Sequence, residues 1–280
     1  MDKIILGIFL FLTIFIIYIF YDNAHPKKEI LKIKKKMPES VDKLRILQIS
    51  DLHNQKFGEN QERLLNLIDD NYDLIFITGD LIDRRYTNIT EAMNLVNNLK
   101  CENIFYIKGN HEKGAKDYPI LEKELLNSGI KVLDNKNFSF RDINICGVDD
   151  PAEYITLSKK KDINEYKVLE ENIKTLLEQS DSKFNILLSH RPEYFDLYVK
   201  YNIDLVFSGH SHGGQVRIFG KGLYSASQGF FGKYDGGVYK KGHTTMVNSR
   251  GLGNNFPFAK RIFNTPQIIE IIVENEKSSL

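Results

Sequence analysis

Two pairs of closely spaced residues have the clearest capacity for chemistry. Asp51 and His53 are separated by one residue, and so are His210 and His212. If a strand continues through such a pair, both side chains project to the same face and can bind one ion together. The two pairs therefore predict a metal site.

Three further donors end apolar runs of the chain. Asp80, Asn110 and His190 each lie beside a glycine or a serine, which leaves room at the backbone for an ion and a ligand. The full candidate set is Asp51, His53, Asp80, Asn110, His190, His210 and His212. Seven donors suit two ions if one carboxylate is shared. Asp80 is the expected bridge, because a carboxylate can bind two cations and a neutral imidazole cannot.

The donor types indicate the chemistry. Oxygen and imidazole ligands without thiolate predict manganese, iron or zinc and argue against copper(I) or an iron-sulfur cluster. Two ions about 3.5 to 4 Å apart can hold a phosphate by its oxygens while a bridging water of lowered pKa attacks phosphorus in line. His111 is not needed as a ligand, so it is the candidate general acid for the leaving alkoxide. The set predicts a dinuclear metal-dependent phosphoesterase.

Five apolar runs of strand length precede these donors and must position them. They cover residues 44–49, 73–78, 103–107, 184–188 and 204–207. Helical apolar spacing lies between the first three runs, at residues 64–68 and 92–99, and residues 163–179 also have a helical pattern. Alternating strands and helices predict an α/β arrangement with its site at the carboxyl ends of the strands.

The carboxyl-terminal part is rich in glycine and aromatic residues. Residues 238–239, 244–247 and 267–273 are strand candidates, and we expect this region to complete a second sheet. Phe230 and Phe231, with Phe256 and Phe258, suggest either core aromatics or an apolar rim that touches lipid. Burial in the core is the expectation, because phenylalanine is most often buried.

The motifs together resemble the calcineurin-like metallophosphoesterases. The matching pieces, in the family's order, are Asp51-Leu-His53, Gly79-Asp80, Gly109-Asn-His-Glu112, Ser189-His190 and Gly209-His-Ser-His212. Each piece alone is weak, but five in order after five strand-like runs are specific. Glycines after His212 and in residues 248–253 resemble the branch that often carries an amino-terminal anchor or export signal.

This resemblance implies a fold and individual roles. The fold would be a four-layer α-β-β-α sandwich. Asp51, His53, Asp80 and His212 would hold the first ion. Asp80, Asn110, His190 and His210 would hold the second, and His111 would be the proton donor.

The amino-terminal segment predicts a membrane helix. Residues 4–21 are 18 residues without a charge, and at about 1.5 Å each they reach roughly 27 Å, close to the hydrocarbon thickness of a bilayer. A cleaved signal peptide is the alternative, but its apolar region is usually shorter and ends at a small-residue site. We expect an anchor at residues 1–22, a basic linker at 23–43 and the catalytic domain at 44–280.

The lysines of the linker bear on orientation. Lys27, Lys28, Lys32, Lys34, Lys35 and Lys36 follow the apolar segment, and by the positive-inside rule they favour a cytoplasmic domain. They also suit a linker held at anionic headgroups, or a solvated spacer, so the side of the membrane stays open.

Composition excludes some classes. The 38 lysines and arginines nearly balance the 37 aspartates and glutamates, and the basic excess of a dedicated nucleic-acid binder is missing. Cys101 and Cys146 lie far apart without metal-site spacing and predict two buried thiols.

Several other polar residues have competing interpretations. His25 and His243 lack partners and are left out of the site. Asp83 is equally consistent with orienting a ligand and with a surface ion pair. Arg191 is not assigned, because it suits both a substrate phosphate and the turn before Pro192.

The predicted function is hydrolysis of phosphomonoesters or phosphodiesters, with a lipid or cell-envelope intermediate as one candidate substrate. Attachment to a bilayer favours such a substrate by raising its local concentration. The alternatives are a nuclease, a protein phosphatase and a non-catalytic membrane scaffold that keeps the metals. The balanced charge argues against the nuclease, and His111, which a structural site does not need, argues against the scaffold.

Overall fold

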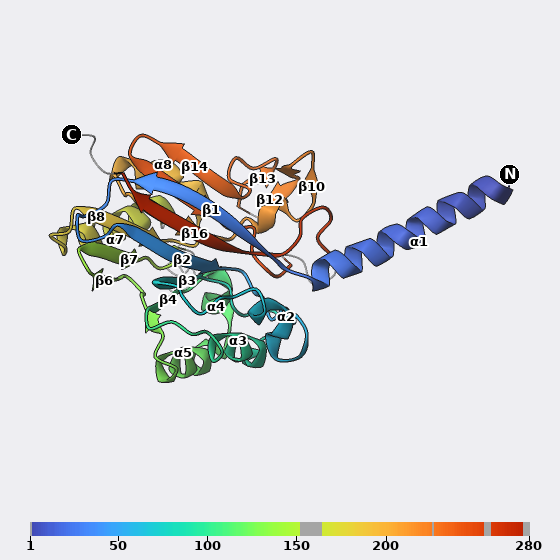
Figure 1. The fold of residues 1–280 in the computed structure, drawn as a ribbon, viewed down its shortest axis with the longest axis horizontal. Coiled ribbons are helices and arrows are strands. Elements are labelled where there is room, and N and C mark those ends of the chain that lie inside the picture. Colours follow the sequence, from blue (N-terminus) through green and yellow to red (C-terminus); the bar gives the residue numbers. More distant parts are fainter. Residues whose placement is uncertain (1, 152–163, 226, 255–258, 277–280) are drawn as a thin grey trace.

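Two six-stranded sheets pack face to face in the computed structural model, which describes residues 2–151, 164–225, 227–254 and 259–276 (Figure 1). The first sheet has the order β1-β16-β2-β3-β4-β5. Its strands are β1 (Lys27–Lys35), β16 (Gln267–Asn275), β2 (Lys43–Ile49), β3 (Leu74–Thr78), β4 (Ile104–Ile107) and β5 (Lys131–Val132). All neighbours are parallel except β16 and β2, so β2, β3 and β4 end at the same edge.

The second sheet has the order β14-β15-β9-β8-β7-β6. Its strands are β14 (Gly237–Lys241), β15 (Thr244–Asn248), β9 (Leu205–Ser208), β8 (Phe184–Leu188), β7 (Ile143–Gly147) and β6 (Lys136–Phe140). The four central strands are parallel, and the two outer strands are antiparallel to their neighbours. Two small hairpins, β10–β11 (Arg217–Ile218, Lys221–Gly222) and β12–β13 (Tyr224–Ser225, Gly229–Phe230), follow β9.

One apolar cluster fills the space between the sheets. Phe76 of the first sheet lies with its ring centroid 4.9 Å from that of Phe207 in the second sheet. Both are fully buried, as are Ile46 and Ile186 on either side. Because successive strand residues point to opposite faces, Ile75 and Ile77 of the same strand pack on the outer face.

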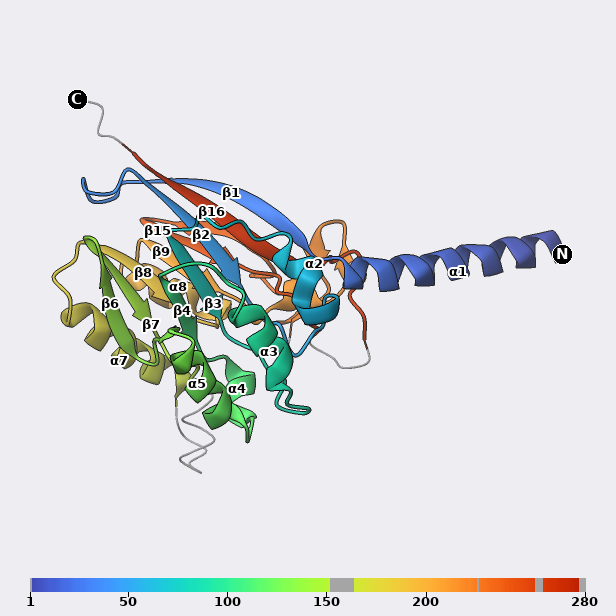
Figure 2. The ribbon, with the colours of Figure 1, turned by 60° about the horizontal axis from the view of Figure 1, so that its bottom comes forward.

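Helices cover both outer faces. The helices are α2 (Glu62–Leu65), α3 (Ile89–Val96), α4 (Asn110–Gly114) and α5 (Tyr118–Asn127), then α7 (Glu165–Glu178) and α8 (Phe195–Lys200), with short 3-10 turns η1 (Glu59–Gln61), η2 (Pro192–Tyr194) and η3 (His212–Gly214). α3 and α5 pack on the first sheet, and α7 and α8 on the second. This confirms the four-layer α-β-β-α sandwich, which Figure 2 shows edge-on.

Local sequence explains where two of the covering helices begin. The side chain of Asn88 accepts a hydrogen bond from the Thr90 N–H at the start of α3, and Asn164 accepts one from Lys167 at the start of α7. Each asparagine satisfies a backbone donor that the first turn leaves without a partner.

The first helix projects from the domain. α1 (Asp2–Ala24) is the only described helix long and apolar enough to cross a membrane, and its apolar window is not buried against the domain. The expected linker at 23–43 is wrong for Lys27–Lys35, because these residues form β1 and pair along their full length with β16. The sheet therefore begins only two residues after α1 ends.

Three further expectations need correction. β16 lies in the first sheet between β1 and β2, whereas β14 and β15 do complete the second sheet. Phe230 and Phe231 are exposed, at 71% and 62%, so they are not core aromatics. Phe256 and Phe258 lie outside the described residues. Cys146 is buried as expected, but Cys101 is only half-buried, and both thiols are free.

Candidate metal centre

The candidate ligands lie in tight loops at the ends of five strands. Asp51 and His53 follow β2, Asp80 follows β3, and His210 and His212 follow β9. All five have φ between 47° and 64°. The strand does not continue through either pair, so the predicted reason for their proximity is wrong. The loops turn back on themselves, and this brings the side chains together instead.

One group of four donors surrounds Asp51 and Asp80. Metal-binding atoms of Asp51, His53, Asp80 and His212 all lie within 4.8 Å of one another, and all four residues are buried. The Nε2 atoms of His53 and His212 are 3.1 Å apart. His53 Nε2 is 3.4 Å from Asp80 Oδ2, and His212 Nε2 is 3.5 Å from Asp51 Oδ1. A cation at their centre would meet two imidazoles and two carboxylates.

A second group shares Asp80 with the first. Asp80, His190 and His210 also have donor atoms within 4.8 Å of one another. His190 Nε2 is 3.2 Å from Asp80 Oδ2, while its Nδ1 lies 2.7 Å from the Thr78 carbonyl oxygen. That carbonyl fixes the ring with Nε2 toward the centre. Asp80 is thus common to both groups.

Asn110 lies at the start of α4, directly after Gly109. Its buried Oδ1 has no hydrogen-bond partner among the described residues. A buried polar atom without a partner costs free energy, and a bound cation removes that cost. The residues therefore fit the two divalent ions that the sequence predicts.

The backbone at position 109, beside Asn110, passes so close to Asp80 that only glycine fits there. A Cβ atom on Gly109 would lie 2.1 Å from Asp80 Oδ1, well inside contact distance. The Asp80 carboxylate instead accepts a hydrogen bond of 2.8 Å from the His111 N–H. Only glycine lets the β3 and β4 loops meet at the shared carboxylate.

Glu112 is a site residue to which the sequence analysis gave no role. It is fully buried, and its Oε2 accepts 2.8 Å hydrogen bonds from the Asp80 and Gly109 N–H groups. Its Oε1 accepts from the Ile82 N–H at 3.2 Å. Glu112 thus holds together the loops that carry Asp80 and Asn110. Its position at N3 of α4, reaching back to the N-cap, was the available signal.

His111 lies at the edge of the first group. Its ring centroid is 4.4 Å from that of His53, and its Nδ1 is 3.4 Å from Asp83 Oδ1. Burial alone would lower the pKa of His111, but Asp80 and Asp83 outweigh burial and the net shift is upward. Asp83 also binds Arg85 through both carboxylate oxygens. Asp83 therefore contacts the proposed proton donor and also forms an ion pair with Arg85, and this pair is buried on the Asp83 side.

Two arginines border the histidines. Arg191 pairs bidentately with Asp150, and its Nη1 lies 3.1 Å from His210 Nε2, so it contacts the site rather than only capping the turn. Arg261 is fully buried, and its Nη2 lies 3.4 Å from His212 Nδ1. Arg261 is 49 residues beyond His212 and was missed, because no local pattern marks it.

The charges around the imidazoles set their protonation. Burial, with weaker effects of neighbouring positive groups, lowers the pKa of His53 and His210 well below its usual range and that of His212 to about 4. Burial also acts on His190, but the Asp80 carboxylate overrides it and raises the pKa of His190 to about 10. Three of the histidines are therefore neutral and ready to ligate at pH 7.

The remaining histidines lie elsewhere. His25 Nδ1 is 2.7 Å from the Tyr21 carbonyl oxygen at the end of α1, and His243 pairs with Asp204. Neither belongs to the described donor groups. Their omission from the site agrees with these positions.

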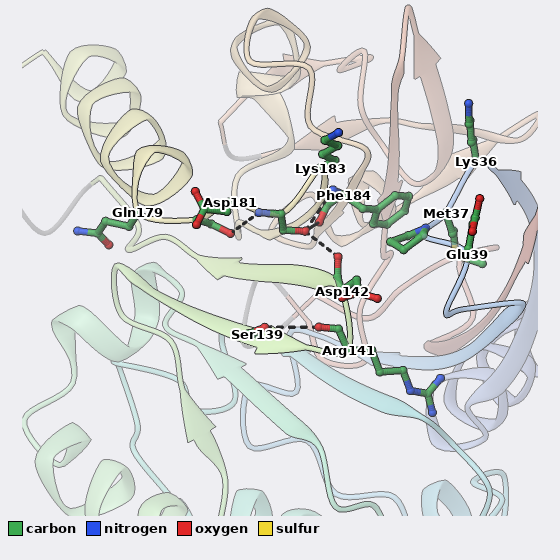
Figure 3. A pocket seen from close by; sticks show the side chains of 13 residues that line it. Lys36, Met37, Glu39, Ser139, Arg141, Asp142, Gln179, Asp181, Lys183 and Phe184 are labelled. Atoms are coloured by element: carbon green, nitrogen blue, oxygen red, sulfur yellow. Dashed lines mark hydrogen bonds between the residues drawn. The ribbon is translucent and has the colours of Figure 1, made fainter.

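A surface pocket of about 990 Å³ lies away from the donors (Figure 3). It is lined by residues that follow β1, lie at the β6–β7 turn or lead into β8, among them Lys36, Asp142 and Phe184, and it contains none of the candidate ligands. Its walls carry both signs of charge and no cluster of metal-binding side chains. We therefore assign the chemistry to the loops at the opposite ends of the strands.

Comparison with known proteins agrees with the fold and the donor set. Residues 44–214 match the calcineurin-like phosphoesterase family. An uncharacterized metallophosphoesterase of Campylobacter jejuni is 30% identical over 95% of this chain and 68% of its own length. One from Helicobacter pylori strain J99 is 32% identical over 78% of this chain and 58% of its own. A bovine transmembrane protein with metallophosphoesterase domain is 24% identical over 85% and 55%.

The chain belongs to the calcineurin-like phosphoesterase family. Membership indicates a metal-dependent hydrolase of phosphoesters, in agreement with the buried Asp/His groups. The chain spans little more than half the length of two of these relatives.

Proposed function

We propose that this protein is a membrane-anchored hydrolase of phosphomonoesters or phosphodiesters that uses two divalent ions, manganese, iron or zinc. The observation that carries the proposal is the position of Asp80, whose carboxylate belongs to both groups of donors. A buried carboxylate with imidazoles on either side is suited to join two cations. When bound, the ions supply Lewis acidity at the phosphate oxygens and lower the pKa of a coordinated water.

The chain's own residues have distinct roles in this proposal. Asp51, His53, Asp80 and His212 hold one ion, and Asp80, Asn110, His190 and His210 hold the other. Glu112 holds the Asp80 and Asn110 loops together by accepting three hydrogen bonds from backbone N–H groups. This arrangement lets the site bind a tetrahedral phosphate without rearranging its ligands.

His111 is the proposed proton donor. Asp83 Oδ1 and the Arg84 N–H both approach Nδ1, at 3.4 and 3.3 Å. Nε2 is therefore the atom that can transfer a proton to the leaving alkoxide. The raised pKa keeps that proton in place near neutral pH, which a general acid requires.

α1 supports the membrane part of the proposal. Its 22-residue apolar span, from Lys3 to Ala24, is long enough to cross a bilayer and is not buried in the domain. A relative named as a transmembrane protein agrees with this assignment. A phosphate ester carried by a lipid or cell-envelope intermediate is the substrate class that such an anchor favours.

The test compares matched aspartate variants of the full chain in detergent. The native protein should release nitrophenol from nitrophenyl phosphate or its bis ester, and chelation should abolish this. Asp80→Asn should lose bound metal, measured by elemental analysis, and at least about a hundredfold of the rate, since the shared ligand is removed. Asp70→Asn, which changes a surface carboxylate paired with Lys100, should behave as native.

The outcomes separate the alternatives. Activity that survives chelation or Asp80→Asn would reject the mechanism. Metal bound without turnover of either ester would favour the scaffold, and metal-dependent cleavage of single-stranded DNA would favour the nuclease.

A further inference from the structure

Three exposed phenylalanines stand on loops near the end of α1. Phe219, Phe231 and Phe263 are 103%, 62% and 57% exposed. All three have φ close to 50°, a conformation that bulky residues rarely adopt. An apolar ring held in water by a strained backbone is doubly unfavourable. Such a combination points to a surface whose usual surroundings are not water.

A short sequence pattern recurs on two of these loops. The turn of the β10–β11 hairpin and the first residue of β11 have the sequence Phe219-Gly-Lys221. The residues that follow β13 have the sequence Phe231-Gly-Lys233. Both lysines are exposed. A third lysine, Lys260, has its Nζ 5.7 Å from the ring centroid of Phe20 in α1. Aromatic rings beside lysines suit a membrane interface, where the rings enter the lipid and the ammonium groups reach the headgroups.

The three loops form one unit with the metal centre. The Arg217 N–H donates to the Ile262 carbonyl at 3.0 Å, and the Phe231 N–H donates to the Leu223 carbonyl at 2.9 Å. The same unit begins at His212, the first residue of η3. Figures 1 and 2 show it at the end of the domain from which α1 leaves.

Phe263 fixes the height of this unit relative to α1. Its ring centroid is 5.9 Å from that of Phe15 and 6.1 Å from that of Tyr18. These residues lie six and three positions before Tyr21, the last residue of the uncharged segment. At a helical rise of about 1.5 Å per residue, Phe263 is level with a point roughly 5 to 9 Å inside that segment. That depth matches the insertion of interfacial side chains.

We propose that Phe219, Phe231 and Phe263 enter the bilayer that holds α1, so that the metal centre faces the lipid headgroups. The proposal rests on the membrane part of the proposed function and adds a second attachment of the domain. Asn23 joins the two attachments. Its side chain donates to the Arg261 carbonyl at 2.8 Å and accepts from the Arg261 N–H at 3.0 Å. Arg261 in turn contacts His212.

The consequence is a narrower substrate class. The phosphate esters that reach the site most readily are those carried by lipids in the same membrane, because their phosphorus lies at the headgroup layer. Esters dissolved in water must reach the metal centre through the space between the domain and the lipid headgroups.

The chain contains no tryptophan, so single substitutions give unambiguous fluorescence. The full chain with Phe219→Trp, Phe231→Trp or Phe263→Trp is reconstituted in phosphatidylcholine and phosphatidylglycerol vesicles brominated near the top of the acyl chains. Phe11→Trp, within α1, reports on the anchor. Leu126→Trp is the water-exposed control, because Leu126 is 56% exposed in the last turn of α5, which leads into the start of β5 at the opposite ends of the strands from the metal loops.

Quenching of the three loop tryptophans at least about twofold above Leu126→Trp is the expected result for insertion at interfacial depth. Quenching of Phe11→Trp alone overturns the docking while leaving the anchor intact. It is also the result expected if a protein partner covers these loops. If none of the variants is quenched, both the docking of the loops and the insertion of α1 are rejected. Three independent loop positions keep the test decisive if one substitution fails to fold.

A second measurement addresses the substrate class. Phe219→Asp combined with Phe231→Asp should leave turnover of water-soluble nitrophenyl phosphate unchanged and lower turnover of a long-chain alkyl nitrophenyl phosphate in vesicles about fivefold or more. An equal change in both rates contradicts the docking. If no ester is hydrolysed, the proposed function fails, and the quenching result stands on its own.

Discussion

The guanidinium Nη2 of Arg261 lies 3.4 Å from Nδ1 of His212, in a fully buried site. Arg261 also donates through Nε and Nη2 to the Gly253 carbonyl, toward which His212 Nδ1 is directed at 3.3 Å. One carbonyl thus orients both a candidate ligand and a buried cation. Burial lowers the pKa of Arg261 to about 9, and its charge helps burial to lower that of His212.

Replacing Arg261 with methionine should raise the pKa of His212. Methionine fills similar volume without the positive charge that disfavours the imidazolium. The measurement is a titration of the His212 ring followed by NMR in metal-free protein. Arg141→Met, which changes a half-exposed arginine paired with Asp73, is the control. An unchanged His212 titration would show that the guanidinium does not act on this ring.

Glu112→Gln should weaken metal binding by about 10- to 100-fold, the range typical of residues that orient ligands. An amide offers only one acceptor oxygen, whereas the carboxylate accepts three backbone N–H groups, two of them on one oxygen. Calorimetric titration with manganese or zinc measures the change. Glu102→Gln, an exposed substitution before β4, should bind as the native chain does. Equal affinities in the two variants would remove Glu112 from the site.

His111→Asn should affect poor leaving groups most. Phenyl phosphate needs a proton on its departing oxygen, so its kcat should fall about 10² to 10⁴-fold. Nitrophenyl phosphate, whose leaving group departs as the anion, should lose far less. Metal content should stay at the native level because His111 is not a proposed ligand. An equal loss with both esters would assign His111 to binding rather than proton transfer.

Metal affinity should rise with pH because His190 must lose a proton to ligate. With its pKa raised to about 10, His190 is charged in the metal-free protein at neutral pH. Each pH unit between about pH 6 and pH 9 should therefore strengthen binding about tenfold. Calorimetry in buffers of different ionisation enthalpy should detect the released proton. A binding enthalpy independent of the buffer would contradict the His190–Asp80 ion pair.

A water-soluble form should begin at residue 26 rather than at residue 40. Starting at 40 removes β1 and with it the buried side chains of Ile33 and Met37, about 3 to 6 kcal/mol of apolar burial. That is a large part of the stability of a typical domain. Thermal unfolding of residues 26–280 should be cooperative, and residues 40–280 should unfold at a much lower temperature or aggregate. Equal midpoints would show that β1 is dispensable.

The donors could be predicted from the sequence because each comes shortly after an apolar strand, and all but His53 lie beside glycine or serine. Asp80 and His190 are examples in which this local pattern also gives the correct place in the fold. The loop conformation could not be predicted in this way. The positive φ of Asp51 and His210 arises from hydrogen bonds to distant segments, such as the His210 N–H to the Asp51 carboxylate.

β1 was missed for a different reason. Its lysines suggested a solvated linker, although Leu31, Ile33 and Lys35 alternate with outward residues and turn their side chains toward the domain. Whether such a strand forms depends on an available edge, and β16 provides that edge from the other end of the chain. Arg261 was missed for a related reason, since its partners lie in loops far from it in sequence.

Only His25 and Pro26 separate α1 from β1, and the Lys27 N–H is already bonded to the Pro266 carbonyl. Where α1 is held in a bilayer, this short connection is a rigid linker and not a flexible one. The rigid linker would restrict the height and the orientation of the domain relative to the membrane surface. Encounters would then depend on lateral diffusion of two membrane components, and the reaction rate on their density per area of lipid.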